Sequence, residues 1–417
     1  MNVELVAIGT ELLLGFTIDT NGAEIGRALA AAGVRVVRRT AVADEPAAIR
    51  AAVAEALART GAVVTTGGLG PTRDDMSKVV VAELFGAGLE FDAAVWEAIV
   101  ARFAGLGRVP AASNRTQAEV PRGAVVLANR WGTAPGLWLE GSVAGRPALA
   151  IMLPGVPREM RKLLEHEVAP RLAARAGAAG TVIRSTAIRT TAIPESTLAE
   201  RLGDVERDLA PLTLAYLPGL DGVDLRLTAW DLPAEEAERR LAAGAVLLRE
   251  RAGEHVYGRD RDDLAAVVLD AARARGLRLA VAESCTGGLV GARLTAIAGS
   301  SDVMLGGVIA YDNAVKTGLL EVPPALLEAH GAVSDPVARA MAEGACRRLG
   351  ADAAVSVTGI AGPGGGSAAK PVGTVWFGVT TSGETSAHHA IFPGSRHEIR
   401  ARAAQTALWL LRRRLSI

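Results

Sequence analysis

The feature that most limits the fold is an alternation of short apolar segments with helix-like segments in the first part of the chain. Segments 3–8 and 62–66 are typical of short strands, whereas 21–32 and 46–59 have the pattern of helices. Short apolar strands that alternate with helices indicate a parallel sheet with helices on both faces. The sequence therefore predicts an α/β fold for this part of the chain.

The same alternation returns after a different middle segment. Residues 277–282 and 353–358 look like strands, and 398–415 looks like a closing helix. The segment between the two α/β patterns carries strands and helices but no cluster of reactive side chains, which suggests a small α+β unit. We expect two α/β domains with mainly parallel sheets joined by a small α+β domain, with boundaries at 1–175, 176–257 and 258–417.

Composition excludes several classes of protein. Lys+Arg and Asp+Glu both number 45, so the formal net charge is zero, which argues against binding nucleic acid or an anionic membrane by bulk charge. The two cysteines belong to no Cys/His cluster, so a zinc site or a disulfide framework is not expected. The start of the chain lacks a signal-peptide pattern, and no apolar stretch is long enough to span a bilayer. We expect a cytoplasmic protein.

Ser284 is the first candidate for chemistry in the last domain. It follows the predicted strand 277–282 and precedes a helix, so it would lie at the carboxyl edge of the sheet, where open α/β sheets bind ligands. The amides of Thr286, Gly287 and Gly288 would lie at the start of that helix, where they could hold a phosphate or an oxyanion. A serine N-cap followed by the glycines of a tight turn would have the same sequence, so this segment alone leaves both interpretations open.

A nucleophilic serine needs a base, and Lys316 is the better candidate for it. None of the six histidines stands in an obvious motif beside a strand end, so a Ser-His-Asp triad has little support. Only four of the 45 basic residues are lysines, and a buried lysine can lose its proton, whereas arginine effectively cannot. A surface lysine on a loop is the competing interpretation.

Two look-alike motifs are attributed to chance. Lys316-Thr317-Gly318 spells one box of the serine β-lactamases, and the segment from Ser367 to Lys370 spells another. Their order is reversed from that of those enzymes, and the second box lies between glycines and a proline instead of opening a helix.

Six segments in the last domain carry a specific resemblance. AESCTGG, YDNAVK, HGAVSDPVA, TGIAGPGGG, KPVGTVWFG and FPGSR resemble, in this order, the nicotinamide-nucleotide amidase domain of the CinA (competence/damage-inducible) family. The resemblance implies hydrolysis of nicotinamide mononucleotide to nicotinate mononucleotide and ammonia, through an acyl-enzyme and without a metal. It implies that Ser284 is the nucleophile and Lys316 the base, with Tyr311 beside them in the catalytic site. The substrate contacts that we expect are Thr286, Gly287, Gly288, Asn313, Thr358, Gly359 and Arg396.

The first domain contains a glycine-rich turn followed by two acids. Gly67, Gly68 and Gly70 let the backbone wrap a phosphate, and Asp74 and Asp75 suit a hard cation such as Mg²⁺. The pattern is not a Walker motif, because no GxxxxGK[ST] occurs.

This region also carries a resemblance. It is similar to the molybdopterin-binding fold, and more closely to the N-terminal CinA domain through GTELLLG, TTGGLGPTRDD, NRTQAEVPRGA, NRWGTAPGLWLE and LPGVPREM. Many relatives have threonine where this chain has Ser77. The resemblance implies metal-dependent cleavage of the pyrophosphate of ADP-ribose, with Asp74 and Asp75 as metal or phosphate-site acids and Asn114 and Arg115 contacting the ligand.

The middle segment resembles the KH-like unit of the full-length family. Gly219–Gly222 spells GxxG, but this loop is acidic and precedes a strand, whereas an RNA-binding KH loop is basic and joins two helices. We expect packing or dimer contact here and no nucleic-acid binding, and the family implies a homodimer.

Three functions compete on this evidence. The favoured one is a bifunctional enzyme of pyridine-nucleotide recycling that acts on nicotinamide mononucleotide and ADP-ribose. The second is a molybdopterin-binding or transfer protein, which would rest on the N-terminal fold, although a fold does not fix a function. The third is a non-enzymatic competence or DNA-damage factor, which only the family name suggests.

Overall fold

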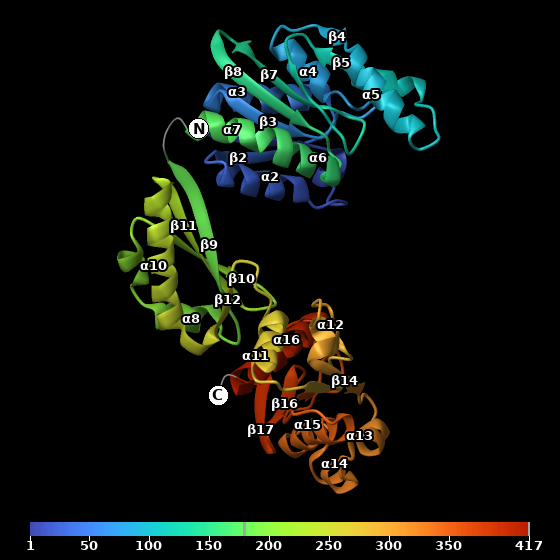
Figure 1. The fold of residues 1–417 in the computed structure, drawn as a ribbon, viewed down its shortest axis with the longest axis vertical. Helices are drawn as coiled ribbons and strands as arrows, with labels where there is room; N and C mark the ends of the chain where they lie inside the picture. Colours follow the sequence, from blue (N-terminus) through green and yellow to red (C-terminus); the bar gives the residue numbers. More distant parts are fainter. Residues whose placement is uncertain (178–180, 416–417) are drawn as a thin grey trace. The chain divides into compact units, whose positions relative to one another are not determined.

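The computed structural model describes residues 1–177 and 181–415 (Figure 1). Contacts between residues divide the chain into two compact units. The first unit comprises Met1–Arg184 with Ala229–Arg239, and the second comprises Ser185–Thr228 with Arg240–Ile417. Both contain α/β sheets, which confirms the predicted fold class. No helix among the described residues is long and apolar enough to cross a membrane.

The first unit is built on a six-stranded sheet in the order β2-β1-β3-β8-β7-β6. The first four strands in that order are parallel to one another, β7 pairs antiparallel with β8, and β6 pairs antiparallel with β7. The strands are β1 (Asn2–Ile8), β2 (Arg35–Val42), β3 (Ala62–Thr66), β6 (Val125–Leu127), β7 (Gly136–Val143) and β8 (Arg146–Leu153), and β4 (Leu89–Phe91) pairs separately with β5 (Glu119–Pro121).

Helices cover both faces of this sheet, as the alternation in the sequence predicted. Val3 and Leu5 of β1 pack with helices α2, α6 and α7, whereas Val6 and Ile8 pack with α3 and α4, because alternate strand residues point to opposite faces (Figure 1). The helices are α1 (Thr10–Leu13), α2 (Thr20–Ala31), α3 (Pro46–Thr60), α4 (Ser77–Leu84), α5 (Ala93–Ala104), η1 (Ala112–Ala118), α6 (Pro157–Leu163), η2 (Leu164–Val168) and α7 (Ala169–Gly177).

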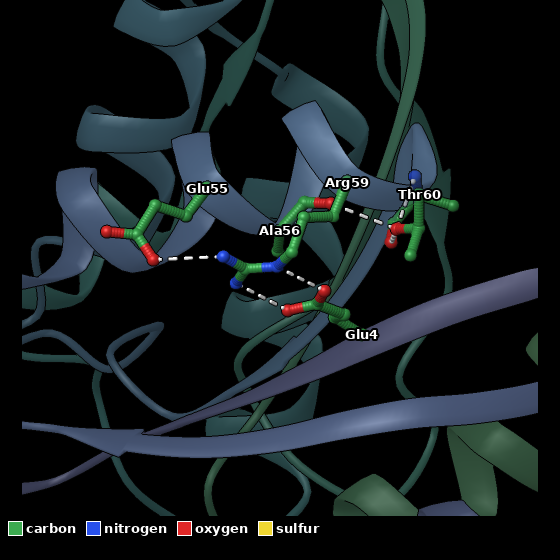
Figure 2. Close-up of polar contacts among 6 residues, drawn as sticks. Glu4, Glu55, Ala56, Arg59 and Thr60 are labelled. Carbon is green, nitrogen blue, oxygen red and sulfur yellow. Dashed lines mark hydrogen bonds and ion pairs between the residues drawn. The ribbon is translucent and has the colours of Figure 1, made fainter.

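An ion pair between an exposed arginine and a buried carboxylate fixes α3 against β1 (Figure 2). Glu4 of β1 is buried, and its two carboxylate oxygens accept hydrogen bonds from Arg59 Nε and Nη2 at 2.7 and 2.8 Å. The bond from Arg59 holds the pKa of Glu4 below its usual value. Arg59 also donates to Glu55 one turn earlier in α3, so a single guanidinium connects the last turns of the helix to the sheet.

The second unit contains a five-stranded sheet in the order β14-β13-β15-β16-β17. Strands β14 (Met304–Ile309), β13 (Leu279–Glu283) and β15 (Ala353–Gly359) are parallel, and β16 (Thr374–Thr381) and β17 (Glu384–Ile391) add an antiparallel hairpin. The parallel part is therefore confined to three strands. The hairpin turns at Ser382 and Gly383, which both have positive φ, as a tight two-residue hairpin loop requires.

Two helical layers enclose this sheet as well. Helices α11, α12 and α16 pack on one face, and α13 and α15 pack on the other. The helices are α11 (Leu264–Ala274), α12 (Leu289–Thr295), η4 (Ser300–Asp302), α13 (Asn313–Leu320), α14 (Pro324–His330), α15 (Asp335–Leu349) and α16 (Arg396–Leu415).

The middle segment forms a four-stranded sheet in the order β10-β11-β9-β12. The elements are β9 (Val182–Thr190), α8 (Glu195–Leu202), α9 (Val205–Leu209), β10 (Thr213–Pro218), β11 (Val223–Leu232), α10 (Ala234–Ala252), η3 (Gly253–His255) and β12 (Val256–Arg259). The GxxG loop joins β10 to β11, and its Asp221 carbonyl accepts a hydrogen bond of 2.8 Å from Gln405 of α16. The loop thus takes part in packing within the second unit.

Candidate active sites

The nucleophile candidate Ser284 stands directly after β13 at the carboxyl edge of the parallel strands. Its amide donates to the Val357 carbonyl of β15 at 2.8 Å, so the neighbouring strand holds the turn. The turn then passes through Gly287 and Gly288, which both have positive φ, before α12 begins. Only 8 % of Ser284 is exposed, so its hydroxyl lies in a largely buried site.

Lys316 of α13 is brought to this serine although 32 positions separate the two in sequence. Its side chain is 1 % exposed, and Nζ lies 3.3 Å from Ser284 Oγ. Burial lowers the pKa of Lys316, and the nearby Asp312 charge opposes this effect. The buried amine is therefore biased toward its neutral form, which a general base needs.

Two backbone carbonyls orient the Lys316 amine. Nζ donates to the Ala310 oxygen at 2.8 Å and to the Tyr311 oxygen at 3.1 Å. A neutral amine has two N–H groups and one lone pair. Because the two carbonyls accept both N–H groups, the lone pair is left for the Ser284 hydroxyl.

Tyr311 and Arg396 form an open part of the same site. Tyr311 is 60 % exposed, and its hydroxyl accepts a hydrogen bond of 2.9 Å from Arg396 Nη2. Arg396 opens α16, and its Nη1 donates to the Gly362 carbonyl at 2.6 Å. Within residues 1–177 and 181–415, no carboxylate pairs with Arg396, so its charge remains available to an anionic ligand.

The other predicted contacts take different positions. The Thr358 hydroxyl is buried and donates to the Ala332 carbonyl at 2.8 Å, so Thr358 shapes the end of β15. A side chain at Gly359 would meet the Thr374 carbonyl at 2.8 Å, so this position requires glycine. Asn313 is exposed at the first turn of α13.

Two of the three predicted anion-binding amides, those of Gly287 and Gly288, already have partners in the protein. The Gly287 amide donates to the Ser284 carbonyl at 3.1 Å, and the Gly288 amide donates to the Glu283 carboxylate at 3.0 Å. Thr286 is buried, and its hydroxyl has no hydrogen-bond partner. In this conformation the glycine amides do not form a free anion site, and Arg396 is the more accessible positive group.

Sequence reasoning did not identify Glu283 as a functional residue. A signal was present, because an acidic side chain ends the otherwise apolar strand LAVAE directly before the nucleophile. Its carboxylate is buried and lies at the start of α12.

The glycine-rich turn of the first unit follows β3. A Cβ at Gly67 would lie 2.1 Å from the Ile8 carbonyl, and one at Gly68 would lie 2.0 Å from Ser77 Oγ. Ser77 Oγ also donates to the Gly67 carbonyl at 2.8 Å, so the hydroxyl retained at this position fixes the turn. Only glycine fits at both positions.

The two acids that follow have different environments. The Thr72 amide and hydroxyl both donate to Oδ2 of Asp75, which closes the turn over Gly70. Asp74 is exposed. In the part of the chain that the structure describes, no group of three or more His, Cys, Asp or Glu side chains could hold a metal by itself.

The remaining N-terminal candidates both contact other side chains of the first unit. Asn114 is buried and bonded to the Ala111 amide and to Gln117, each at 3.0 Å, so it braces its own segment. The guanidinium of Arg115 lies 4.1 Å from the centre of the Phe91 ring. Their predicted contact with a ligand stays a prediction.

Comparisons with known proteins show which families this chain resembles. Three family models match the chain: "Probable molybdopterin binding domain" over residues 4–174, "Damage-inducible protein CinA KH domain" over 185–258 and "CinA C-terminal domain" over 261–415. A CinA-like protein from Gemmatimonas aurantiaca is 55 % identical over 414 residues, which cover 99 % of this chain and 96 % of the relative. The chain belongs to the CinA family.

A second full-length relative agrees with this membership. A CinA-like protein from Salinibacter ruber is 42 % identical over 418 residues, with 100 % of both chains covered. Among solved structures, the competence/damage inducible protein CihA from Agrobacterium tumefaciens is 44 % identical, with a TM-score of 0.36, and covers 37 % of this CinA-family chain and 94 % of its own.

Proposed function

We propose that this CinA-family chain is an amidohydrolase that converts nicotinamide mononucleotide to nicotinate mononucleotide and ammonia. The observation that carries the proposal is the contact of 3.3 Å between the buried amine of Lys316 and the hydroxyl of Ser284. A serine hydroxyl becomes a useful nucleophile only next to a base, and this is the base that the site provides. The role of these residues in pyridine-nucleotide recycling is inferred from the family resemblance.

The first half of the reaction forms an ester. Neutral Lys316 takes the proton of Ser284 Oγ while the oxygen attacks the carboxamide carbon and generates a tetrahedral oxyanion. The intermediate collapses with breakage of the C–N bond. The Lys316 ammonium returns its proton to the leaving nitrogen, so that ammonia departs and the amine is neutral again.

The second half restores the enzyme. A water molecule loses a proton to Lys316 and attacks the ester carbon, and the C–O bond to Ser284 then breaks. The serine oxygen regains a proton from Lys316, and the nicotinate nucleotide leaves as an acid. No step needs a metal, because the proton shuttle and the nucleophile are both protein groups.

Arg396 and Tyr311 would bind the rest of the substrate. A guanidinium is suited to bidentate binding of phosphate, and Arg396 has no carboxylate partner among the described residues. Because Arg396 donates to the exposed Tyr311 hydroxyl, the two side chains present one polar surface, and the backbone carbonyl of Tyr311 contacts Lys316 Nζ. We assign the nucleotide phosphate to this surface.

Chromatography of the reaction tests the proposal. Purified protein with EDTA should convert nicotinamide mononucleotide to nicotinate mononucleotide with an equal amount of ammonia. Ser284→Ala, which removes only the attacking oxygen, should yield neither product. Conversion that is equally fast in the alanine variant would refute the proposed nucleophile.

A second activity is proposed for the first unit: metal-dependent cleavage of the pyrophosphate of ADP-ribose. Gly67 and Gly68 form a turn that only glycine fits, and Asp74 and Asp75 follow it after five residues. Both bonds from Thr72 go to Oδ2 of Asp75, so its Oδ1 and the exposed Asp74 carboxylate are hard oxygen donors. Mg²⁺ commonly uses one or two carboxylates together with substrate phosphates, so this donor set fits it.

When bound, a divalent ion would neutralise phosphate charge and activate water at this place. Asp74 and Asp75 would hold it, and the glycine turn would bind the phosphates. Release of AMP and ribose 5-phosphate from ADP-ribose with Mg²⁺, and its loss with EDTA, is the expected result. Binding of a pterin without cleavage of ADP-ribose would instead favour a molybdopterin-binding protein.

A further inference from the structure

Glu283 is a buried carboxylate placed one residue before the proposed nucleophile. It is 1 % exposed, and its two oxygens accept three backbone hydrogen bonds from the start of α12. Oε2 accepts from the Gly288 and Val290 amides at 3.0 and 3.1 Å, and Oε1 accepts from the Gly291 amide at 2.8 Å.

The charge of this carboxylate has no cationic partner. Among the described residues, no basic side chain forms an ion pair with Glu283, and its hydrogen bonds come from amides alone. Backbone amides at a helix start carry partial positive charge and bind carboxylates strongly. The carboxylate therefore occupies the donors that would otherwise attract a ligand anion to this helix.

The backbone of Glu283 connects the same residue to the base. Its carbonyl accepts a hydrogen bond of 2.7 Å from the Ala310 amide. The Ala310 carbonyl in turn accepts from Lys316 Nζ at 2.8 Å. Glu283 is thus linked to the helix after the nucleophile through its side chain and to the segment that holds the base through its main chain.

We infer that Glu283 is a positioning residue that fixes the Ser284 turn relative to Lys316 by clamping the turn to α12. This inference rests on the proposed Ser/Lys mechanism. Ser284 Oγ lies 3.3 Å from Lys316 Nζ. This distance depends on the direction in which the chain leaves the end of β13 and on the path of the turn that follows. Loss of the clamp frees the path between Ser284 and Gly288, and misplacement of reacting groups by about 1 Å can cost on the order of 100-fold in rate.

The inference also assigns the phosphate to one side of the site. The Glu283 carboxylate accepts the hydrogen bonds of the α12 amides and adds negative charge there. The nucleotide phosphate therefore binds toward Arg396. A variant without the carboxylate should slow the chemistry and leave the KM of the nucleotide nearly unchanged, since Glu283 itself touches no ligand.

Three variants separate the clamp from simple helix capping. Glu283→Ala removes all three bonds. Glu283→Gln keeps one oxygen for the Gly288 and Val290 amides but turns an amide nitrogen toward the Gly291 N–H, so it should be intermediate. Asp352→Asn is the matched control, because the Asp352 carboxylate also accepts a hydrogen bond from a backbone amide, that of Arg278 at 2.7 Å. Asp352 lies where β13 and β15 begin, at the ends of these strands opposite to Ser284.

Two readouts are measured on each folded variant in the full chain. The first is kcat and KM for nicotinamide mononucleotide, and the second is the rate at which a fluorophosphonate labels Ser284. We expect Glu283→Ala to lower kcat and the labelling rate by about 100-fold and Glu283→Gln by about 10-fold. Asp352→Asn should match the wild type in both.

The outcomes separate this inference from the proposed substrate. Slow labelling of Ser284 in the Glu283 variants supports the clamp, whether or not the wild type hydrolyses the nucleotide. Failure of the wild type to hydrolyse the nucleotide would refute only the proposed substrate. Wild-type labelling and kcat in folded Glu283→Gln, whether or not the alanine variant folds, would overturn the inference. Lower thermal stability of the Glu283 variants with an unchanged rate of Ser284 labelling would also overturn the inference, because Glu283 would then act only as a helix cap.

Discussion

Replacement of Lys316 by methionine should abolish activity while relieving the folded state of a buried amine. Methionine has nearly the same length but no proton to exchange. The change removes the contacts of Nζ with Ser284 Oγ, the Ala310 oxygen and the Tyr311 oxygen, at 3.3, 2.8 and 3.1 Å. No other residue in the described site is placed to accept the serine proton.

The expected loss follows from the role of the amine. General-base catalysis contributes roughly 10²–10⁴-fold, which corresponds to about 2.7–5.5 kcal/mol of activation free energy. KM should change little, because Lys316 contacts the nucleophile and two carbonyls. In the wild type, kcat/KM should rise with pH as Lys316 deprotonates, with an apparent pKa below that of an ordinary lysine, because burial lowers the pKa of this group.

The wild type and the methionine variant should also differ in how their free energy of unfolding depends on pH. Since the pKa of Lys316 is lowered in the folded state, the unfolded chain binds the proton more tightly, and folding of the wild type becomes more favourable as pH rises toward the usual lysine pKa. The methionine variant lacks this dependence, although each of its two unpaired carbonyls costs about 1–3 kcal/mol. The free energy of unfolding of the wild type minus that of the variant should therefore increase with pH.

The assay combines ammonia release with denaturant unfolding between neutral and alkaline pH. Lys162→Met is the control, because Lys162 is a surface residue of the first unit that pairs with Glu165 at 2.9 Å. It should show wild-type activity and no such pH trend. More than a tenth of the wild-type kcat in folded Lys316→Met would refute the reasoning.

Three further predictions concern the surroundings of the dyad and the second site. Arg396→Ala should raise KM for the nucleotide by roughly 10- to 100-fold, with a smaller effect on kcat, because a hydrogen bond to a charged group contributes about 1.5–3 kcal/mol. An unchanged KM would contradict the assignment of the phosphate to Arg396. Burial raises the pKa of the Cys285 thiol to about 12, so iodoacetamide at neutral pH should leave the amidase active, and rapid inactivation with label on Cys285 would contradict this. Asp74→Asn should abolish Mg²⁺-dependent cleavage of ADP-ribose and leave ammonia release intact, whereas parallel loss of both activities would argue against two separate sites.

Much of the fold was predictable from the sequence because apolar periodicity marks buried strands. Ala62–Thr66 and Leu279–Glu283 are buried throughout, and both were recognised from their patterns. Strand β17 was missed because its residues ETSAHHAI are mostly polar and only partly buried, so no apolar pattern marks it. Pairing with β16 makes it a strand, and local sequence does not report such pairing.

The candidate site was predictable in part. Family-like motifs pointed to Ser284 and Lys316, and the structure brings their side chains together. The use of the Gly288 amide inside the protein was not predictable, because it depends on the side chain of Glu283 folding back onto α12. The same holds for Thr358, whose hydroxyl is turned to the Ala332 carbonyl by tertiary packing.

The most direct test of the central claim is to trap the acyl-enzyme. Wild-type protein would be mixed with nicotinamide mononucleotide in EDTA, quenched in acid within one turnover and analysed by intact and peptide mass spectrometry. The mechanism predicts a nicotinate-nucleotide ester on the peptide that contains Ser284, absent in Ser284→Ala. Product formation by the wild type with no adduct on this peptide, together with turnover by Ser284→Ala, would contradict the claim.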